Sequence, residues 1–237
     1  MVLKIKKKLL VQEMGKFGMN GGQQIIECLL KFEKDGMKTI TVSAGQLCAV
    51  KYSLKPEAFE EYEAIGNVGL DDFSKLISVI NSFNEILTIK KEGNKLTVSE
   101  GSKKVAIPLV EEEYIKKIDK LPDLEHDEIV EIESDILKNI FKDVQLNKDA
   151  IITIETFEKK FKISNSGKYA FSYDVDSEKT KGGVKCSFGQ PMVDALSNLT
   201  GKLELHMKND YPTIVKEQLP YTEIEVMVSP WVEDSKE

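Results

Sequence analysis

The order of predicted elements occurs twice along the chain, and this repeat is the feature that most limits its fold. In the first half, the patterns predict a helix, successive strands, a second helix and a hairpin, at residues 7–18, 25–54, 69–83 and 84–100. The same order recurs in the second half at residues 133–147, 149–175, 190–201 and 202–219, offset by roughly 120 residues. Two copies of one small α+β unit are the simplest fold with this order.

Apolar spacing and turn residues mark the individual elements. In the first copy, apolar residues recur at i, i+3, i+4 and i+7 at Phe73, Leu76, Ile77 and Ile80. In the second copy, one helical face carries Ile136, Leu137, Ile140 and Val144, and Ser134 is predicted to cap that helix. Pro191 suits the first turn of the last helix, and Gly93-Asn94 suits the hairpin turn.

A segment with neither helical nor strand periodicity separates the two copies. Residues 116–128 mix charged residues with Pro122, which predicts a linker. The expected domains are therefore residues 1–116 and 129–237, with a connecting loop at residues 117–128. The segment also carries the apolar residues Ile118, Leu121 and Leu124. These either pin it to a domain surface or help to form a groove for a partner.

Composition places the chain among globular proteins of the cell interior. Of its 237 residues, 41% are hydrophobic and 31% are charged, which suits a packed core rather than disorder. No apolar run approaches the roughly 20 residues that a membrane span needs, and no signal peptide is expected at the N-terminus. An odd, scattered set of cysteines, Cys28, Cys48 and Cys186, favours reduced thiols in an intracellular compartment.

All 33 basic residues are lysines, because the chain contains no arginine. AT-rich coding explains this bias most simply, but it still removes bidentate recognition of guanine. Contacts to nucleic acid would then be point-charge contacts to phosphate, which carry no sequence information. The formal net charge is −7, and it comes from the second half of the chain. Such a chain is not an obvious DNA-binding protein.

Signals of catalysis are absent from the sequence. The only two histidines are His126 in the linker and His206 in a predicted strand, and both suit surface positions. No Cys-x-x-Cys, phosphate-binding loop or Gly-x-Ser-x-Gly motif occurs. The acidic runs at residues 60–63 and 111–114 suit solvated surfaces. We therefore expect no enzyme activity, no cofactor and no metal site.

Three stretches resemble PCNA-type DNA sliding clamps of the archaeal, eukaryotic and viral kind. They are residues 35–62, residues 66–89, and a C-terminal region with a proline-led strand at 211–217 and the run "EIEVMVSPWVED" at 223–234. The resemblance covers the whole chain in element order. It implies rings of repeated domains, with antiparallel sheets outside and helices around a hole for duplex DNA. A clamp of this kind tethers DNA polymerase and other replication and repair enzymes, which confers processivity.

The resemblance implies that positive residues face the hole, although the chain is acidic overall. The candidate DNA-binding lysines are Lys7, Lys8, Lys16, Lys75, Lys138, Lys142 and Lys202. Taken singly, each lysine also suits an ordinary solvated helix face. Contacts of this kind are few and salt-sensitive, which suits sliding.

The resemblance also implies that two strands close the ring between subunits. One carries Val105, Ile107 and Leu109, and the other carries Tyr169, Phe171 and Tyr173. Pro108 cannot donate a ladder hydrogen bond, so its strand belongs at a sheet edge or bulge. The alternative is that both are ordinary outer strands of separate sheets. Whether the trimer has one kind of chain or three is left open.

Partner proteins of such clamps insert a short aromatic-bearing peptide into a pocket. The pocket residues implied here are Val42, Leu47, Ala49, Leu121, Pro212, Met227, Val228, Ser229 and Pro230. The expected partners are DNA polymerase, the clamp loader, flap endonuclease and ligase. Trp231 stands where the family often has a lysine-like residue, so it packs backward into the core or extends the pocket rim. Alternatives are a monomeric or dimeric processivity factor, a checkpoint-type clamp subunit and, more remotely, a duplicated-domain enzyme.

Overall fold

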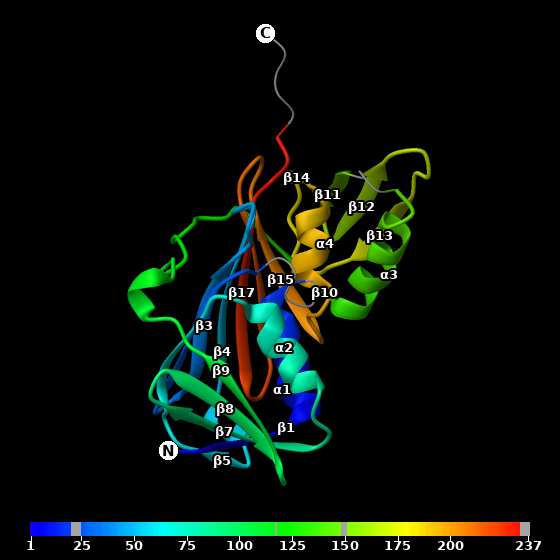
Figure 1. Cartoon of the computed structure of the whole chain (residues 1–237). Helices are drawn as coiled ribbons and strands as arrows, with labels where there is room; N and C mark the ends of the chain where they lie inside the picture. The colour runs from blue at the N-terminus through cyan, green and yellow to red at the C-terminus, as the bar shows by residue number, and fades with distance from the viewer. Residues whose placement is uncertain (20–24, 117, 148–150, 233–237) are drawn as a thin grey trace. The chain divides into compact units, whose positions relative to one another are not determined.

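The computed structural model describes residues 1–19, 25–116, 118–147 and 151–232. Its contacts divide the chain into two compact units, Met1–Leu121 with Leu219–Ile224, and Pro122–Gln218 with Glu225–Glu237. Each unit combines two helices with antiparallel strands, as the predicted α+β class requires (Figure 1). The division falls inside the predicted connecting loop, and it also assigns a short C-terminal segment to the first unit. None of the helices described is long and apolar enough to cross a membrane.

The first unit contains two groups of paired strands. One group has the order β5-β1-β7-β8-β9, and the other has the order β4-β3-β2-β6. The strands are β1 (Leu3–Lys6), β2 (Cys28–Glu33), β3 (Gly36–Val42), β4 (Cys48–Leu54), β5 (Glu61–Tyr62), β6 (Gly66–Leu70), β7 (Ile86–Glu92), β8 (Lys95–Glu100) and β9 (Lys103–Pro108). Short 3-10 turns lie at η2 (Pro56–Ala58) and η3 (Glu112–Tyr114). The predicted hairpin at residues 84–100 is confirmed, because β7 and β8 pair antiparallel around the turn.

Two helices, α1 (Lys7–Gly18) and α2 (Phe73–Asn81), lie side by side in this unit (Figure 1). The Phe17 and Phe73 rings are 5.3 Å apart between centroids. Gly18 permits this approach, because a Cβ there would lie 2.7 Å from the Phe73 ring. The Asp72 side chain caps α2 by accepting a hydrogen bond from the Lys75 backbone N–H at 2.9 Å.

The second unit also has two groups of paired strands, with the orders β13-β12-β11-β14 and β10-β15-β16-β17. The strands are β10 (Glu128–Glu133), β11 (Ile151–Phe157), β12 (Lys160–Ser166), β13 (Ser172–Asp176), β14 (Lys185–Phe188), β15 (Lys202–Met207), β16 (Thr213–Gln218) and β17 (Thr222–Val228). The helices are α3 (Ser134–Val144) and α4 (Gln190–Leu196), the latter with Pro191 in its first turn as predicted. Alternate strand residues, such as Val130 and Ile132 of β10, form the buried core.

Two details of the predicted α3 are wrong. Glu133, not Ser134, occupies the cap position, because β10 runs directly into the helix. The buried Ser134 instead donates its backbone N–H to the Gly201 carbonyl at 2.8 Å. The buried face also includes Phe141, whereas Ile136 is 39% exposed, because the helix is rotated relative to the predicted stripe.

Candidate functional site

Five of the seven candidate DNA-binding lysines lie on helices with their side chains at least partly accessible. Lys8 on α1, Lys75 on α2 and Lys142 on α3 are exposed, and Lys7 and Lys138 are half-buried. The Lys7 ammonium donates to the Asn81 carbonyl at 3.1 Å, and Lys138 lies 3.8 Å from Asp135. The exposed lysines thus occupy three of the four helices described.

The prediction that Lys16 contacts DNA is wrong, because its side chain is completely buried. Its ammonium lies 3.2 Å from the Glu13 carboxylate, which is itself 4% exposed. Glu13 also accepts hydrogen bonds from the Tyr52 hydroxyl at 2.8 Å and the Thr222 hydroxyl at 2.9 Å. Lys16 therefore belongs to a buried polar network that connects α1 to β4 and β17.

We expect Glu13→Ala to destabilise the protein by about 3–5 kcal/mol, because it leaves the Lys16 charge buried without its carboxylate. Denaturant unfolding would measure the change in the free energy of unfolding. The matched control is Glu223→Ala, which removes an exposed ion pair with Lys55 at 3.6 Å. That change should cost no more than about 1 kcal/mol, and equal losses in the two variants would contradict the prediction.

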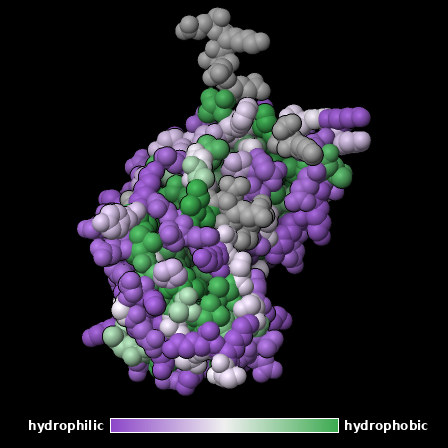
Figure 2. Space-filling model, viewed as in Figure 1, coloured by the Kyte–Doolittle hydropathy of each residue, from purple (hydrophilic) through white to green (hydrophobic). Residues whose placement is uncertain are grey.

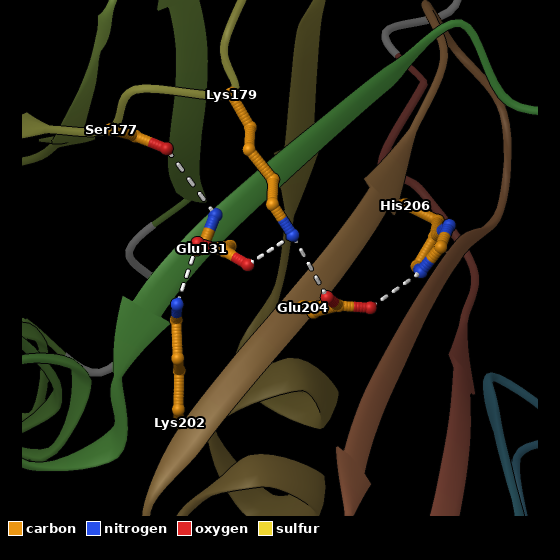
Figure 3. Close-up of polar contacts among 6 residues, drawn as sticks. All are labelled: Glu131, Ser177, Lys179, Lys202, Glu204 and His206. Atoms are coloured by element: carbon orange, nitrogen blue, oxygen red, sulfur yellow. Dashed lines mark hydrogen bonds and ion pairs between the residues drawn. The ribbon is translucent and has the colours of Figure 1, made fainter.

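Lys202 lies on a strand and is neutralised by a carboxylate. It begins β15, and its ammonium is 2.7 Å from Glu131 on β10. Figure 3 shows this group: Glu131 also accepts from Lys179, which in turn contacts Glu204. Hydrogen bonds from Lys179 and then Lys202 hold the pKa of Glu131 below its usual value. Lys202 is therefore not placed among the helix-borne cations.

The two histidines lie next to each other, which the sequence patterns did not indicate. The ring centroids of His126 and His206 are 6.1 Å apart. His126 Nε2 lies 2.9 Å from the Pro212 carbonyl oxygen, at hydrogen-bonding distance. The neighbouring Asp127 N–H donates to the Met207 carbonyl at 3.1 Å. These contacts hold the end of the predicted linker against the second unit.

Burial, followed by the nearby Lys216 charge, lowers the pKa of His206 below its ordinary value of 6.5. Glu204 opposes this shift, and His126 adds to it. The unfolded chain therefore binds a proton at a higher pH than the folded chain does. The stability from neutral His206 is complete above about pH 6.5 and is lost as the pH falls through the folded pKa.

We accordingly expect the free energy of unfolding to decrease between pH 7.5 and 5.5, and His206→Gln to flatten that decrease. Urea unfolding at a series of pH values would measure both slopes. Glutamine is the suitable replacement, because it is polar but does not titrate in this range. Identical pH dependence in the wild type and the variant would contradict the assignment to His206.

The two predicted subunit-contact strands lie at free sheet edges in the strand order. β9 ends one group of strands in the first unit, and β13 ends a group in the second. The prediction that Pro108 lies on an edge strand is confirmed. Ile107 is 4% exposed, Val105 is half-buried, and Leu109 follows the end of β9.

The second of these strands is shorter than its alternating sequence predicts. β13 begins at Ser172, so Tyr169 and Phe171 lie in the turn before it. Asn165 occupies their backbone groups, accepting from the Phe171 N–H at 2.8 Å and donating to the Tyr169 carbonyl at 3.0 Å. Tyr173 lies within the strand and donates its hydroxyl hydrogen bond to Asp143. The asparagine contacts explain why the ladder starts later than expected.

The residues implied for a peptide pocket differ in accessibility. Leu47 is 47% exposed, whereas Ala49, Leu121 and Val228 are buried. The half-buried members are Val42, Pro212, Met227, Ser229 and Pro230. Val228 is 1% exposed because β17 directs alternate side chains inward, so the expectation that its side chain is an open anchor site is wrong. Met227 is the more accessible neighbour.

Trp231 is not a core residue, since its side chain is 52% exposed. Its backbone N–H donates to the Ser187 carbonyl at 2.7 Å, which holds the segment after β17 beside β14. Figure 2 shows one face of the molecule, where apolar residues stand among mostly hydrophilic ones. The backbone bond explains how this large apolar side chain stays near the surface.

The arrangement defines a two-unit α+β fold of the DNA-clamp class, and comparison with solved structures gives the same result. The chain matches Archaeoglobus-type "A. fulgidus PCNA", solved with the C-terminal region of FEN-1, with a TM-score of 0.85, 15% identity and coverage of 99% of both chains. Entamoeba histolytica PCNA gives 0.81 at 16% identity, covering 98% of both chains. A PCNA2-PCNA3 complex from Sulfolobus tokodaii gives 0.80 at 17% identity, covering 98% of this chain and 100% of the matched chain. The chain therefore has the PCNA fold.

Curated sequences support the same resemblance, which is confirmed. A protein named DNA polymerase sliding clamp from Methanococcus maripaludis is 30% identical over 148 residues, covering 60% of this chain and 58% of that protein. One with the same name from Nanoarchaeum equitans is 27% identical over 127 residues, covering 50% of each. The match thus spans about half to three fifths of the curated relatives' length. No family model matches the chain.

Proposed function

We propose that this protein is a sliding clamp, a non-catalytic ring that encircles duplex DNA and tethers DNA polymerase and other replication and repair enzymes. The observation that carries the proposal is the PCNA fold over nearly the whole chain, at a TM-score of 0.85. The sequence matches to proteins named DNA polymerase sliding clamp support it. The clamp works inside the cell as a trimer, and a clamp loader places it on DNA.

The exposed lysines Lys8, Lys75 and Lys142 are the proposed contacts to the DNA backbone, with Lys7 and Lys138 beside them. They offer point charges to phosphates and no bidentate recognition of bases. Contacts of this kind would hold DNA loosely and independently of sequence. Loose contacts suit a protein that must move along the duplex.

Partner enzymes, including polymerase, flap endonuclease and ligase, would bind through short peptides with aliphatic and aromatic anchors. In the first unit Leu47 is the accessible apolar residue for such a peptide. In the second unit Met227, Ser229 and Pro230 present partly accessible side chains. A few anchors carry most of the binding energy at sites of this kind.

The decisive test is whether the protein, once loaded, stays on closed circular DNA and leaves linear DNA. A ring is held by topology, whereas a monomeric or dimeric processivity factor is held by surface contacts. The second class would treat both DNA forms alike. Retention on the closed form alone therefore separates the proposed function from that alternative.

A further inference from the structure

The backbone of β9 presents hydrogen-bonding groups to solvent at defined residues. The Leu109 N–H donates to the Asn94 carbonyl on the β8 side at 2.8 Å. Backbone groups of successive residues point to opposite sides of an antiparallel strand. Odd-numbered residues of β9 therefore face β8, and Lys104 and Ala106 direct their N–H groups to the free edge. Pro108 offers only its carbonyl there.

The free edge of β13 has the same parity. The Ser177 N–H donates to the Lys159 carbonyl at 2.9 Å, and the Asn165 N–H donates to the Phe171 carbonyl at 3.3 Å. Odd-numbered residues of this strand thus face β12. The groups left free belong to Ser172, Asp174 and Asp176.

Parity and length together leave a single complete pairing between these edges. Antiparallel bonding requires outward-facing residues to stand opposite each other, so even-numbered residues must face even-numbered residues. With that condition, only one register sets all five residues of β13 opposite residues of β9. A shift by two residues in either direction leaves part of β13 opposite a turn or loop.

We propose that β9 of one copy pairs antiparallel with β13 of a second copy, with Lys104 opposite Asp176, Ala106 opposite Asp174 and Pro108 opposite Ser172. This rests on the proposed function, and it names the residues that fix the subunit seam. Every outward N–H on both strands then has a carbonyl acceptor. The missing N–H of Pro108 falls at the last pair, where it costs least.

Side chains support this register. The odd-numbered residues share one face, which brings Val105 opposite Val175 and Ile107 opposite Tyr173. On the other face, the exposed Lys104 meets the exposed Asp176. Opposite charges facing each other across a ladder stabilise the pair, whereas like charges destabilise it.

The same charges disfavour pairing of identical edges. Two β13 edges centred on Asp174 would bring two carboxylates face to face. Two β9 edges centred on Ala106 would set Pro108, which has no N–H, opposite a Lys104 carbonyl. The favoured contact is therefore head-to-tail, the kind that closes a ring when the rotation between subunits permits it.

Cysteine cross-linking between two full-length variants tests the register. Mixed Ala106→Cys and Asp174→Cys proteins should form a disulfide-linked dimer on oxidation, because directly opposite residues have Cα atoms about 5.5 Å apart. Ala106→Cys with Ser172→Cys, and Ala106→Cys with Asp176→Cys, should cross-link at least about tenfold more slowly, because two-residue offsets exceed the disulfide range. The native Cys28, Cys48 and Cys186 are buried, and the wild type gives the background.

Charge exchange gives a second measurement that does not need cysteines. Lys104→Asp should weaken association in light scattering about tenfold or less, and adding Asp176→Lys to the same chain should restore it. Both side chains are exposed, so the exchange should leave the fold of each subunit intact.

The outcomes separate the register from the proposed function. Faster cross-linking at an offset pair would overturn the register and leave the ring standing. A trimeric mass with no cross-link at any pair would place the seam elsewhere and overturn the inference alone. A mass of 26.7 kDa at tens of micromolar, with no cross-link, would overturn both the seam and the homotrimeric ring.

Discussion

After loading by a clamp loader, the protein should remain on closed circular duplex DNA through a moderate-salt wash, and linearising the DNA should release nearly all of it. The reason is the charge: the formal net charge is −7 and the chain has no arginine, so its direct affinity for DNA is weak. A closed ring needs no such affinity to stay bound. Gel filtration of labelled protein with DNA, before and after a single restriction cut, measures the retained fraction.

Lysine variants sharpen this experiment. Lys75→Glu reverses an exposed charge on α2 and should reduce loading, because loading depends on contacts between clamp and duplex. Lys202→Glu is the matched control, since Lys202 lies on β15 beside Glu131 and not on a helix. Equal retention on linear and circular DNA would refute topological binding. Tight sequence-specific binding to a short linear duplex would refute the clamp function itself.

Leu47→Asp should abolish binding of a peptide with one aliphatic and two aromatic anchors, while leaving the folded protein intact. Leu47 is 47% exposed, so a carboxylate there meets solvent in the free protein but is desolvated under an apolar anchor. Loss of one anchor contact costs roughly 1–3 kcal/mol, or about 5- to 150-fold in affinity. Calorimetry with a synthetic peptide measures the change.

The control for this titration is Leu146→Asp. Leu146 is 65% exposed and follows the end of α3 in the second unit, so the same change of chemistry is made away from the proposed peptide contacts. It should leave affinity unchanged. Val228→Asp is unsuitable as a test, because the buried side chain would disturb folding as well as binding. Wild-type affinity in the Leu47 variant would move the peptide site to another surface.

Local patterns were sufficient to predict most of the elements. The helix at residues 7–18, the helix around Phe73 and the hairpin around Gly93-Asn94 all formed where their spacing placed them. Pro108 identified an edge strand, because a missing N–H limits pairing wherever the strand lies. These signals are reliable because backbone geometry and near neighbours determine them.

Tertiary contacts decided which side chains those elements expose. A lysine near a helix end reads as solvated, yet Glu13, Tyr52 and Thr222 surround an interior where Lys16 is buried. Alternation gives β17 two faces but does not say that Val228 faces inward.

The histidines and the two edge strands show the same division. Composition alone identified His126 and His206 as the only histidines, but the fold placed their rings 6.1 Å apart. The sequence likewise determined that β9 and β13 alternate, whereas sheet order determined that each has a free edge. Periodicity reports a residue's neighbours along its own helix or strand, but burial and pairing depend on elements that are distant in sequence, and these only the folded chain brings together.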